Sequence, residues 1–274
     1  MTATLDSVHV YPVKSLDGIE RDRTTVRESG GLAFDREYAV RDADGGYVNG
    51  KRERRVHRLA SEFDPDSGRW TVGPRDGERE TFRLPDERGA ASEFLTGVLG
   101  YEVSIDRDAT GGFPDDGNAG GPTVVSQATL DAVAGWYDGI DATELRRRLR
   151  PNLIVGGVEP FWEDRLYADR ESVVRFTVGG TRFEGRNPCQ RCVVPTRDPD
   201  TGAETPGFRE RFVSRRETTL PEWADEDWYD HYFRLMVNTR VPRETVGAQV
   251  AVGDEIEIGE TVDAGEQVRG DTGR

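Results

Sequence analysis

The sequence predicts an α+β fold that is rich in β-strands and has a few short helices. Short apolar runs recur along most of the 274-residue chain, and their alternating pattern is typical of half-buried strands. Turn-forming pairs such as Asp-Gly, Gly-Gly and Asp-Pro separate these runs. The 32 glycines also favour a chain with many loops and strands. Helical spacing is confined to three short segments, so helices are expected to be the minor component.

The first part of the chain is expected to be a small β-rich unit. Strands are predicted over residues 4–13, 31–40, 56–63, 69–72, 80–84 and 101–105. A helix is predicted over residues 90–99, where apolar residues form an i, i+1, i+4, i+5 stripe. The polar, glycine-rich stretch 106–121 follows as a linker or an active-site loop. We therefore predict two domains, over residues 1–110 and 111–274.

The second part mixes short strands with two helices. Ser126 ends a predicted strand over residues 123–126 and is the expected N-cap of a helix through Trp136. A basic helix over 143–150 could dock an acidic electron carrier, but ion pairing on a helix surface explains such a cluster more often. Further strands are predicted over residues 153–155, 174–178, 181–185, 231–237 and 250–258. The segment 207–228 is expected to be irregular, and the tail from residue 259 to be frayed.

Composition limits the classes of partner. The net charge is -15, and of 37 basic residues only Lys14 and Lys51 are lysine. An acidic, lysine-poor surface suits a halophilic protein that works at very high salt, although an acidic protein from a GC-rich genome has a similar composition. The charge disfavours a nucleic-acid partner. There is no apolar run of about 18 residues and no leader-like amino terminus, so we expect a cytoplasmic protein with no membrane segment.

Both cysteines lie in one stretch, RNPCQRCVVPTRDPDTG, from Arg186 to Gly202. It follows a predicted hairpin that turns at Gly179-Gly180. A zinc site would need two more Cys or His ligands, and the histidines are scattered singly. A thioredoxin-like pair would open a helix, but Pro195 and an Asp-Pro-Asp-Thr-Gly turn follow instead. A buried structural pair and a single thiolate ligand to a cofactor-bound metal stay open.

A second candidate site lies at the end of the first strand. Lys14 and Ser15 enter a turn there, and an ammonium, a hydroxyl and turn amides suit a phosphate group. Arg36 lies within the strand predicted over residues 31–40, where an ordinary exposed ion pair would explain it. Arg150 and Asn152 flank Pro151 before the strand over residues 153–155. This segment suits a simple helix stop, with Pro151 ending the helix and Asn152 shaping the turn.

These motifs, in this order, resemble those of the MOSC domain family. The quoted residues are YPVKS, GL-x-x-DR, RPN and C-x-R-C followed by DPDTG, and the likeness spans residues 4 to 258. It implies an N-terminal MOSC-type β-barrel domain followed by a MOSC β-barrel domain. It also implies that Lys14, Ser15 and Arg36 hold the terminal phosphate of a molybdopterin-type molybdenum cofactor, with tungsten as the alternative metal. Arg150 and Asn152 would line the pterin and metal pocket. Cys192 would be the catalytic cysteine and the protein's metal ligand, with no obligatory metal role for Cys189.

The likeness is to the branch that reduces amidoximes and other N-hydroxylated compounds. It implies an oxidoreductase whose small-molecule substrate loses oxygen from an N–OH group. Electrons are expected from a separate ferredoxin or flavin reductase type of protein, because the sequence has no cysteines to spare for an iron–sulfur cluster. Two alternatives remain open. Cys192 could carry a persulfide in a sulfur-carrier protein, or the chain could store the cofactor without redox turnover.

Overall fold

The computed structural model describes residues 2–115 and 120–265. This part of the chain forms fifteen β-strands and four α-helices, joined by five short 3₁₀ helices. The predicted α+β, β-rich fold class is therefore confirmed. None of the helices within these two ranges is both long and apolar enough to cross a membrane.

The largest element is an eight-stranded sheet with the order β15-β11-β12-β13-β9-β10-β1-β2. Its members are β1 (Thr4–Val10), β2 (Ile19–Arg21), β9 (Val124–Ser126), β10 (Leu153–Gly156), β11 (Ser172–Val178), β12 (Thr181–Gln190), β13 (Arg234–Arg240) and β15 (Ile256–Asp263). β1 pairs antiparallel with β10, and β10 runs parallel to β9. The first two strands of the chain, β1 and β2, thus belong to a sheet whose other six strands come from residues after 123. The domain division at residue 110 stays a prediction.

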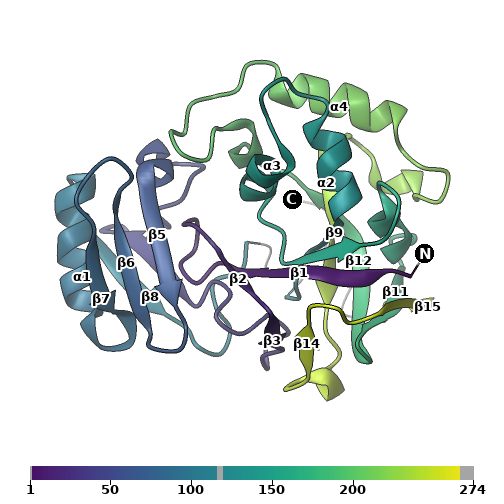
Figure 1. Ribbon diagram of the computed structural model, residues 1–274. Helices are drawn as coiled ribbons and strands as arrows, with labels where there is room; N and C mark the ends of the chain where they lie inside the picture. Colours follow the sequence, from purple (N-terminus) through teal and green to yellow (C-terminus); the bar gives the residue numbers. More distant parts are fainter. Residues whose placement is uncertain (1, 116–119, 266–274) are drawn as a thin grey trace.

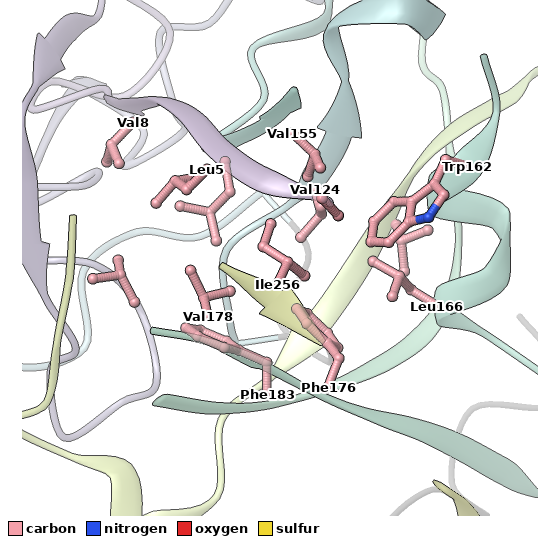
Figure 2. Packing of buried hydrophobic residues seen from close by; sticks show 14 of the residues in the cluster. Leu5, Val8, Val124, Val155, Trp162, Leu166, Phe176, Val178, Phe183 and Ile256 are labelled. Atoms are coloured by element: carbon pink, nitrogen blue, oxygen red, sulfur yellow. The ribbon is translucent and has the colours of Figure 1, made fainter. Parts of the chain in front are cut away.

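Alternating side chains give this sheet two buried faces. Val124 and Val155 belong to one core, where Figure 2 shows them near Phe176 and Ile256. Their neighbours Val125 and Ile154 point to the other core, which includes residues of the helices. These helices are α2 (Gln127–Ala134), α3 (Ala142–Leu149) and α4 (Phe208–Thr218), and they lie on one side of the sheet in Figure 1. Because both faces are covered, the strands read as apolar runs as well as alternating ones.

The first part of the chain has its own core, separate in Figure 1 from the large sheet. It contains β5 (Leu59–Asp64), β6 (Arg69–Pro74) and β7 (Glu80–Arg83) in one sheet, β4 (Tyr38–Asp42) and β8 (Val103–Arg107) in another, and α1 (Leu84–Leu99). Trp70, Leu84 and Leu95 are fully buried between them. A further pair, β3 (Arg23–Thr25) with β14 (Gln249–Ala251), joins distant segments.

The segment after β1 connects the two regions. Val8 and Val10 belong to the core of the large sheet, whereas Val13 and Leu16 belong to the core of the first part. Lys14 and Ser15 therefore stand where the chain crosses from one core to the other. Ser15 has a φ of 71°, in the left-handed region that few non-glycine residues adopt.

Several expected boundaries are wrong. α1 begins at Leu84 rather than at residue 90, because Pro85 is well suited to a first helical position. A 3₁₀ helix, η1 (Arg54–Arg58), replaces the start of the strand expected over residues 56–63.

Two further segments are more regular than the sequence predicts. α4 forms within the segment expected to be irregular, because Phe208, Phe212 and Arg216 give it one buried stripe at i, i+4, i+8. β15 extends to Asp263 by pairing with β11, where a frayed tail was expected. Residues 266–274 of that tail, and 116–119 of the glycine-rich stretch, lie outside the described residues.

Candidate functional site

Tyr11 forms the centre of a group of charged side chains at the crossing between the two cores. The guanidinium carbon of Arg150 lies 4.0 Å from the centroid of its ring, and that of Arg36 lies 5.2 Å away. The Tyr11 hydroxyl donates a 3.0 Å hydrogen bond to the carbonyl of Pro151. We call Tyr11, Lys14, Arg36, Asp115 and Arg150 the Tyr11 cluster. Tyr11 thereby joins the three sequence motifs that carry Lys14, Arg36 and Arg150.

Backbone hydrogen bonds place Arg36 beside Lys14. The Arg36 amide donates to the carbonyl of Tyr11 at 2.8 Å, and the Lys14 amide donates to the carbonyl of Tyr38 at 2.8 Å. Arg36 has a φ of 51°, a conformation that costs free energy and is often kept at functional sites. Its side chain also pairs with the neighbouring Asp35 carboxylate.

One carboxylate bridges the two cations. Lys14 Nζ donates to Asp115 Oδ1 at 2.5 Å, and Arg36 Nε donates to Asp115 Oδ2 at 2.9 Å. Lys14 Nζ also donates to the carbonyls of Phe113 at 2.9 Å and Pro114 at 3.1 Å. The glycine-rich stretch that precedes residue 116 therefore lies against the residues expected to bind a phosphate.

The electrostatics of this pairing follow from burial and charge. Burial lowers the pKa of Lys14, while Asp115 opposes that shift. Enclosure by protein disfavours the charged form of Asp115, but Arg36 and Lys14 outweigh it and lower the pKa of this carboxyl. The Asp115 side chain is 58% exposed. The Lys14 and Arg36 side chains are only 8% and 10% exposed.

Arg150 ends α3 with a φ of 58° and turns its side chain back toward the crossing. Its Nη1 donates to the carbonyl of Leu16 at 2.5 Å. Its Nη2 is buried and has no hydrogen-bond partner among residues 2–115 and 120–265. Burial lowers the pKa of Arg150, and the nearby Arg36 charge adds to this. A buried guanidinium with a free donor is costly unless an acceptor reaches it, so Arg150 can serve a ligand.

The structure gives Asn152 a different set of contacts from the expected pterin edge. Its Oδ1 accepts from the amide of Thr123 at 3.1 Å and from the Thr123 hydroxyl at 3.3 Å. Its Nδ2 donates to the carbonyl of His9 at 3.0 Å. These bonds tie β1 to the start of β10 and leave one amide hydrogen for any other partner. Contact between Asn152 and a pterin stays a prediction.

The two cysteines, both free thiols, differ in their surroundings. Cys189 lies in β12, packs against the helix-side core and accepts a hydrogen bond from Arg191 Nη1 at 3.2 Å. Cys192 lies beyond that strand, and its half-buried thiol has no hydrogen-bond partner in the described part of the chain. Val193 beside it is 45% exposed. A single 3₁₀ turn, η3 (Val194–Thr196), follows instead of an α-helix.

A small cavity of about 40 Å³ joins the two halves of the candidate site. Ser15 and Leu16 line it from the first crossing, Arg150 from the end of α3, and Val194 and Arg197 from the segment after Cys192. The chain thus brings Ser15, Arg150 and the cysteine segment to one place. A cavity of this size has no room for a pterin ring, so it does not indicate where such a ring would lie.

Ion pairs hold the cysteine segment against the first part of the chain. Asp200, in the Asp-Pro-Asp-Thr-Gly turn, pairs with Arg147 of α3 at 2.5 Å and with Arg75 at 3.0 Å. Arg75 in turn contacts Asp17 at 2.9 Å. Arg148 is buried and pairs with Glu144 at 2.6 Å. Arg147 and Arg148 are therefore committed to intramolecular ion pairs, whereas Arg146 contacts the His9 ring at 3.2 Å.

Two members of the Tyr11 cluster were not assigned from the sequence. Tyr11 is the first residue of the quoted YPVKS motif, so the motif could have pointed to it. Asp115 has no local pattern, because its partners lie 79 and 101 residues away. In the same described ranges, no three His, Cys, Asp or Glu side chains come together in a way that could hold a metal ion.

Comparison with known families finds one match in each part of the chain. Residues 2–103 match the MOSC N-terminal beta barrel domain, and residues 120–257 match the MOSC domain. The second match covers half of the chain. No match to a curated protein was found.

Proposed function

The chain belongs to the MOSC domain family, and from this premise we propose that it is an oxidoreductase that reduces N-hydroxylated compounds with a molybdenum cofactor. MOSC domains are associated with binding of that cofactor. The reductase activity rests on the C-x-R-C motif and its likeness to the amidoxime-reducing branch. The substrate would gain two electrons and two protons and release water.

The observation that carries the proposal is the convergence of Lys14, Arg36 and Arg150. Asp115 links Lys14 to Arg36, and the Tyr11 ring contacts both Arg36 and Arg150. Lys14, Arg36 and Arg150 come from three separate segments, and among their direct partners in the described residues only Asp35 and Asp115 are carboxylates. Three cations against two anions leave a surplus of positive charge in a protein whose net charge is -15. A buried, unpartnered Arg150 Nη2 adds a free donor. This donor set fits the phosphate end of the cofactor.

Each proposed residue has a role that its position supports. Lys14, Ser15 and Arg36 would hold the terminal phosphate, and Arg150 would donate toward the cofactor from the cavity wall. Asn152 would offer its remaining amide hydrogen. Cys192, whose thiol is half-buried and free of hydrogen bonds in the described ranges, would be the protein's ligand to the metal. When bound, the cofactor would supply the two-electron redox chemistry that removes oxygen from N–OH. A separate ferredoxin or flavin reductase type of protein would supply the electrons.

Metal content tests the assignment directly. Cys192→Ser should fold normally but lose metal and N-hydroxyl reduction, while Cys189→Ser should keep a substantial fraction of both, because Cys189 is bonded to Arg191 and packed in the core. Elemental analysis of protein from its own host would also distinguish molybdenum from tungsten. Equal metal content in the wild type and in Cys192→Ser would contradict the ligand role.

One observation also suits a sulfur-carrier protein. The Cys192 thiol lies beside the exposed Val193, where a sulfur donor could reach it. A persulfide on Cys192 would release thiocyanate with cyanide and need no metal. Labile sulfur without stoichiometric metal would favour this second function. Stoichiometric metal without turnover would instead favour a cofactor-storage protein.

A further inference from the structure

We propose that Asp115 is an internal competitor for the phosphate site, so that a phosphate must displace its carboxylate from Lys14 and Arg36 to bind. This inference rests on the proposed function, because it assumes that these two cations hold a phosphate. It assigns Asp115 a role in selecting the ligand, which neither the family match nor the sequence motifs give it.

The geometry is the first argument. The two carboxylate oxygens of Asp115 are divided between the two cations, with Oδ1 on Lys14 and Oδ2 on Arg36. Two oxygens of one phosphate would make the same pair of charge-assisted hydrogen bonds. Lys14 Nζ already donates to two carbonyls besides Asp115, which accounts for all three of its hydrogens. A phosphate therefore gains Lys14 only by replacing one of these acceptors.

Exposure decides which acceptor is the easiest to replace. The side chains of Lys14 and Arg36 are nearly buried, and backbone hydrogen bonds fix their segments beside Tyr11. The Asp115 side chain is 58% exposed and reaches the cations from the solvent side. It can rotate into water at little cost in solvation, whereas the carbonyls of Phe113 and Pro114 move only with the backbone. Asp115 is thus the exchangeable partner.

Charge determines which ligands win the exchange. A monoanion replaces Asp115 by an equal charge and gains little. A phosphate dianion brings a second charge, and Arg150 Nη2 offers it a buried donor without a partner in the described ranges. Arg150 lies close enough to Asp115 to lower that carboxyl's pKa, after the larger effects of Arg36 and Lys14. Asp115 would therefore favour dianionic phosphates over carboxylates and other monoanions.

Phosphate titration of the full-length chain, produced in a host that makes no molybdopterin, tests the inference. We would measure the Kd for inorganic phosphate by calorimetry for the wild type, Asp115→Asn and Asp115→Ala. If Asp115 occupies most sites, only a small fraction of the protein is free to bind phosphate. Removing the carboxylate makes every site available, so we expect the apparent Kd to fall roughly ten- to a hundredfold. Acetate should bind measurably only to the two variants, because a singly charged carboxylate cannot displace the Asp115 carboxylate of the wild type.

Asp106→Asn is the matched control. Asp106 opens the same glycine-rich stretch and pairs with Arg41 at 2.6 Å rather than with a member of the Tyr11 cluster. Asp106→Asn changes the net charge by the same amount as Asp115→Asn does. Because Asp106 is not in the phosphate site, the phosphate Kd of Asp106→Asn should equal that of the wild type. Circular dichroism would establish that each variant is folded, and Asp115→Ala tests the same point without the amide of asparagine.

The outcomes separate this inference from the proposed function. Tighter phosphate binding by both Asp115 variants, but not by Asp106→Asn, supports the competitor role. Equal or weaker binding by the Asp115 variants overturns it and leaves the phosphate site standing, with Asp115 as a residue that holds the cations in place. Phosphate binding by none of the proteins overturns both the competitor role and the proposed phosphate site.

Discussion

Two groups of buried charges in this chain have similar chemistry but different surroundings. In the Arg216 cluster, between α4 and η2 (Trp162–Leu166), Arg216 Nη2 donates to Asp164 at 2.5 Å and to the Tyr229 hydroxyl at 2.7 Å. Tyr229 and Tyr167 share a 2.9 Å hydrogen bond, and Glu163 lies fully buried beside Asp164. The Arg216 side chain is 0% exposed. The Tyr11 cluster instead has one partner, Asp115, that faces solvent.

Unpartnered donors do not distinguish these two clusters. Arg216 Nε and Nη1 lack hydrogen-bond partners in the described residues, as does Arg150 Nη2. The balance of charge does distinguish them. Arg216 pairs with Asp164, and the adjacent Glu163 adds a second buried carboxyl group, whose pKa is raised to about 7 by burial and by Asp164. The Tyr11 cluster has more cations than carboxylates. We therefore propose that the Tyr11 cluster, with its surplus of cations and its path to solvent, binds an anion, whereas the sealed Arg216–Asp164 pair holds α4 against η2.

The largest expected effect is the loss of stability when the Arg216 cluster is broken. Arg216→Leu would leave Asp164 buried without its cation, which typically costs about 3–5 kcal/mol. The free energy of unfolding from urea titration measures this. Arg215→Leu, one residue away and exposed, should change the free energy by less than about 0.5 kcal/mol. A small loss in Arg216→Leu would mean that Asp164 is neutral in the folded protein.

Lys14→Ala should show the opposite pattern, with a large effect on binding and a small one on stability. Charge-assisted contacts to a phosphate are worth on the order of 1.5–3 kcal/mol, so cofactor retention should fall roughly ten- to a hundredfold. Asp115 would keep Arg36 as its partner, so no buried charge is left unpaired and stability should fall by about 1 kcal/mol or less. Arg36→Ala should weaken retention similarly, and the double variant should be non-additive.

Lys51→Ala is the control for this pair of measurements. Lys51 is the second lysine of the sequence and is exposed. Its removal should leave both cofactor retention after dialysis and the free energy of unfolding unchanged. If Lys14→Ala retained as much cofactor as Lys51→Ala, the phosphate would have to lie elsewhere.

These contrasts also show which parts of the structure could be predicted from sequence. The hairpin at Gly179-Gly180 and the cap at Ser126 were confirmed because their signals are local: positive φ angles at the glycines and a serine hydroxyl that accepts from the Thr129 amide at 3.0 Å. α4 was missed because Arg216 occupies its buried stripe and hides the apolar period. A buried arginine can be understood only once Asp164, 52 residues away, is known to meet it.

The residues of the candidate site also divide into those that lie in a local sequence motif and those that do not. Lys14, Ser15, Arg36 and Arg150 could be proposed because each lies in a short motif, and the structure brings them together. Asp115 could not be proposed, since no local rule connects it with Lys14. Asn152 was proposed for its amide, but an amide also suits a strand junction, and the contacts to Thr123 and His9 are visible only in the fold.

Glu163 gives the third prediction, a dependence of stability on pH. Its pKa is raised from 4.5 to about 7 by burial and by Asp164. Between these values the folded chain holds a proton that the unfolded chain releases, so this group's contribution to stability falls as pH rises toward 7. Glu163→Gln should remove a loss on the order of 1–3 kcal/mol between pH 5 and pH 7.5. The exposed Glu217→Gln should keep the wild-type slope, and an unchanged slope in Glu163→Gln would refute the raised pKa.

The smallest expected effect concerns salt, and it separates the clusters by access to solvent. The Debye length falls from about 8 Å at 0.15 M salt to about 3 Å at 1 M. The pairing of Asp115 with Lys14 and Arg36 is open to solvent, so Asp115→Asn should cost about 0.5–1 kcal/mol at low salt and less in molar salt. The loss in Arg216→Leu should not change, because ions do not reach a sealed pair.

The wild type itself should become more stable in molar salt if its acidic, lysine-poor composition is a halophilic trait, since screening reduces repulsion among its carboxylates. Thermal unfolding of the wild type, Asp115→Asn and Arg216→Leu from 0.15 M to 2 M salt measures all of these changes in stability. A loss in Arg216→Leu that shrinks with salt as much as the loss in Asp115→Asn would show that the Arg216 cluster is open to solvent, and the contrast between a sealed pair and an accessible site would then fail.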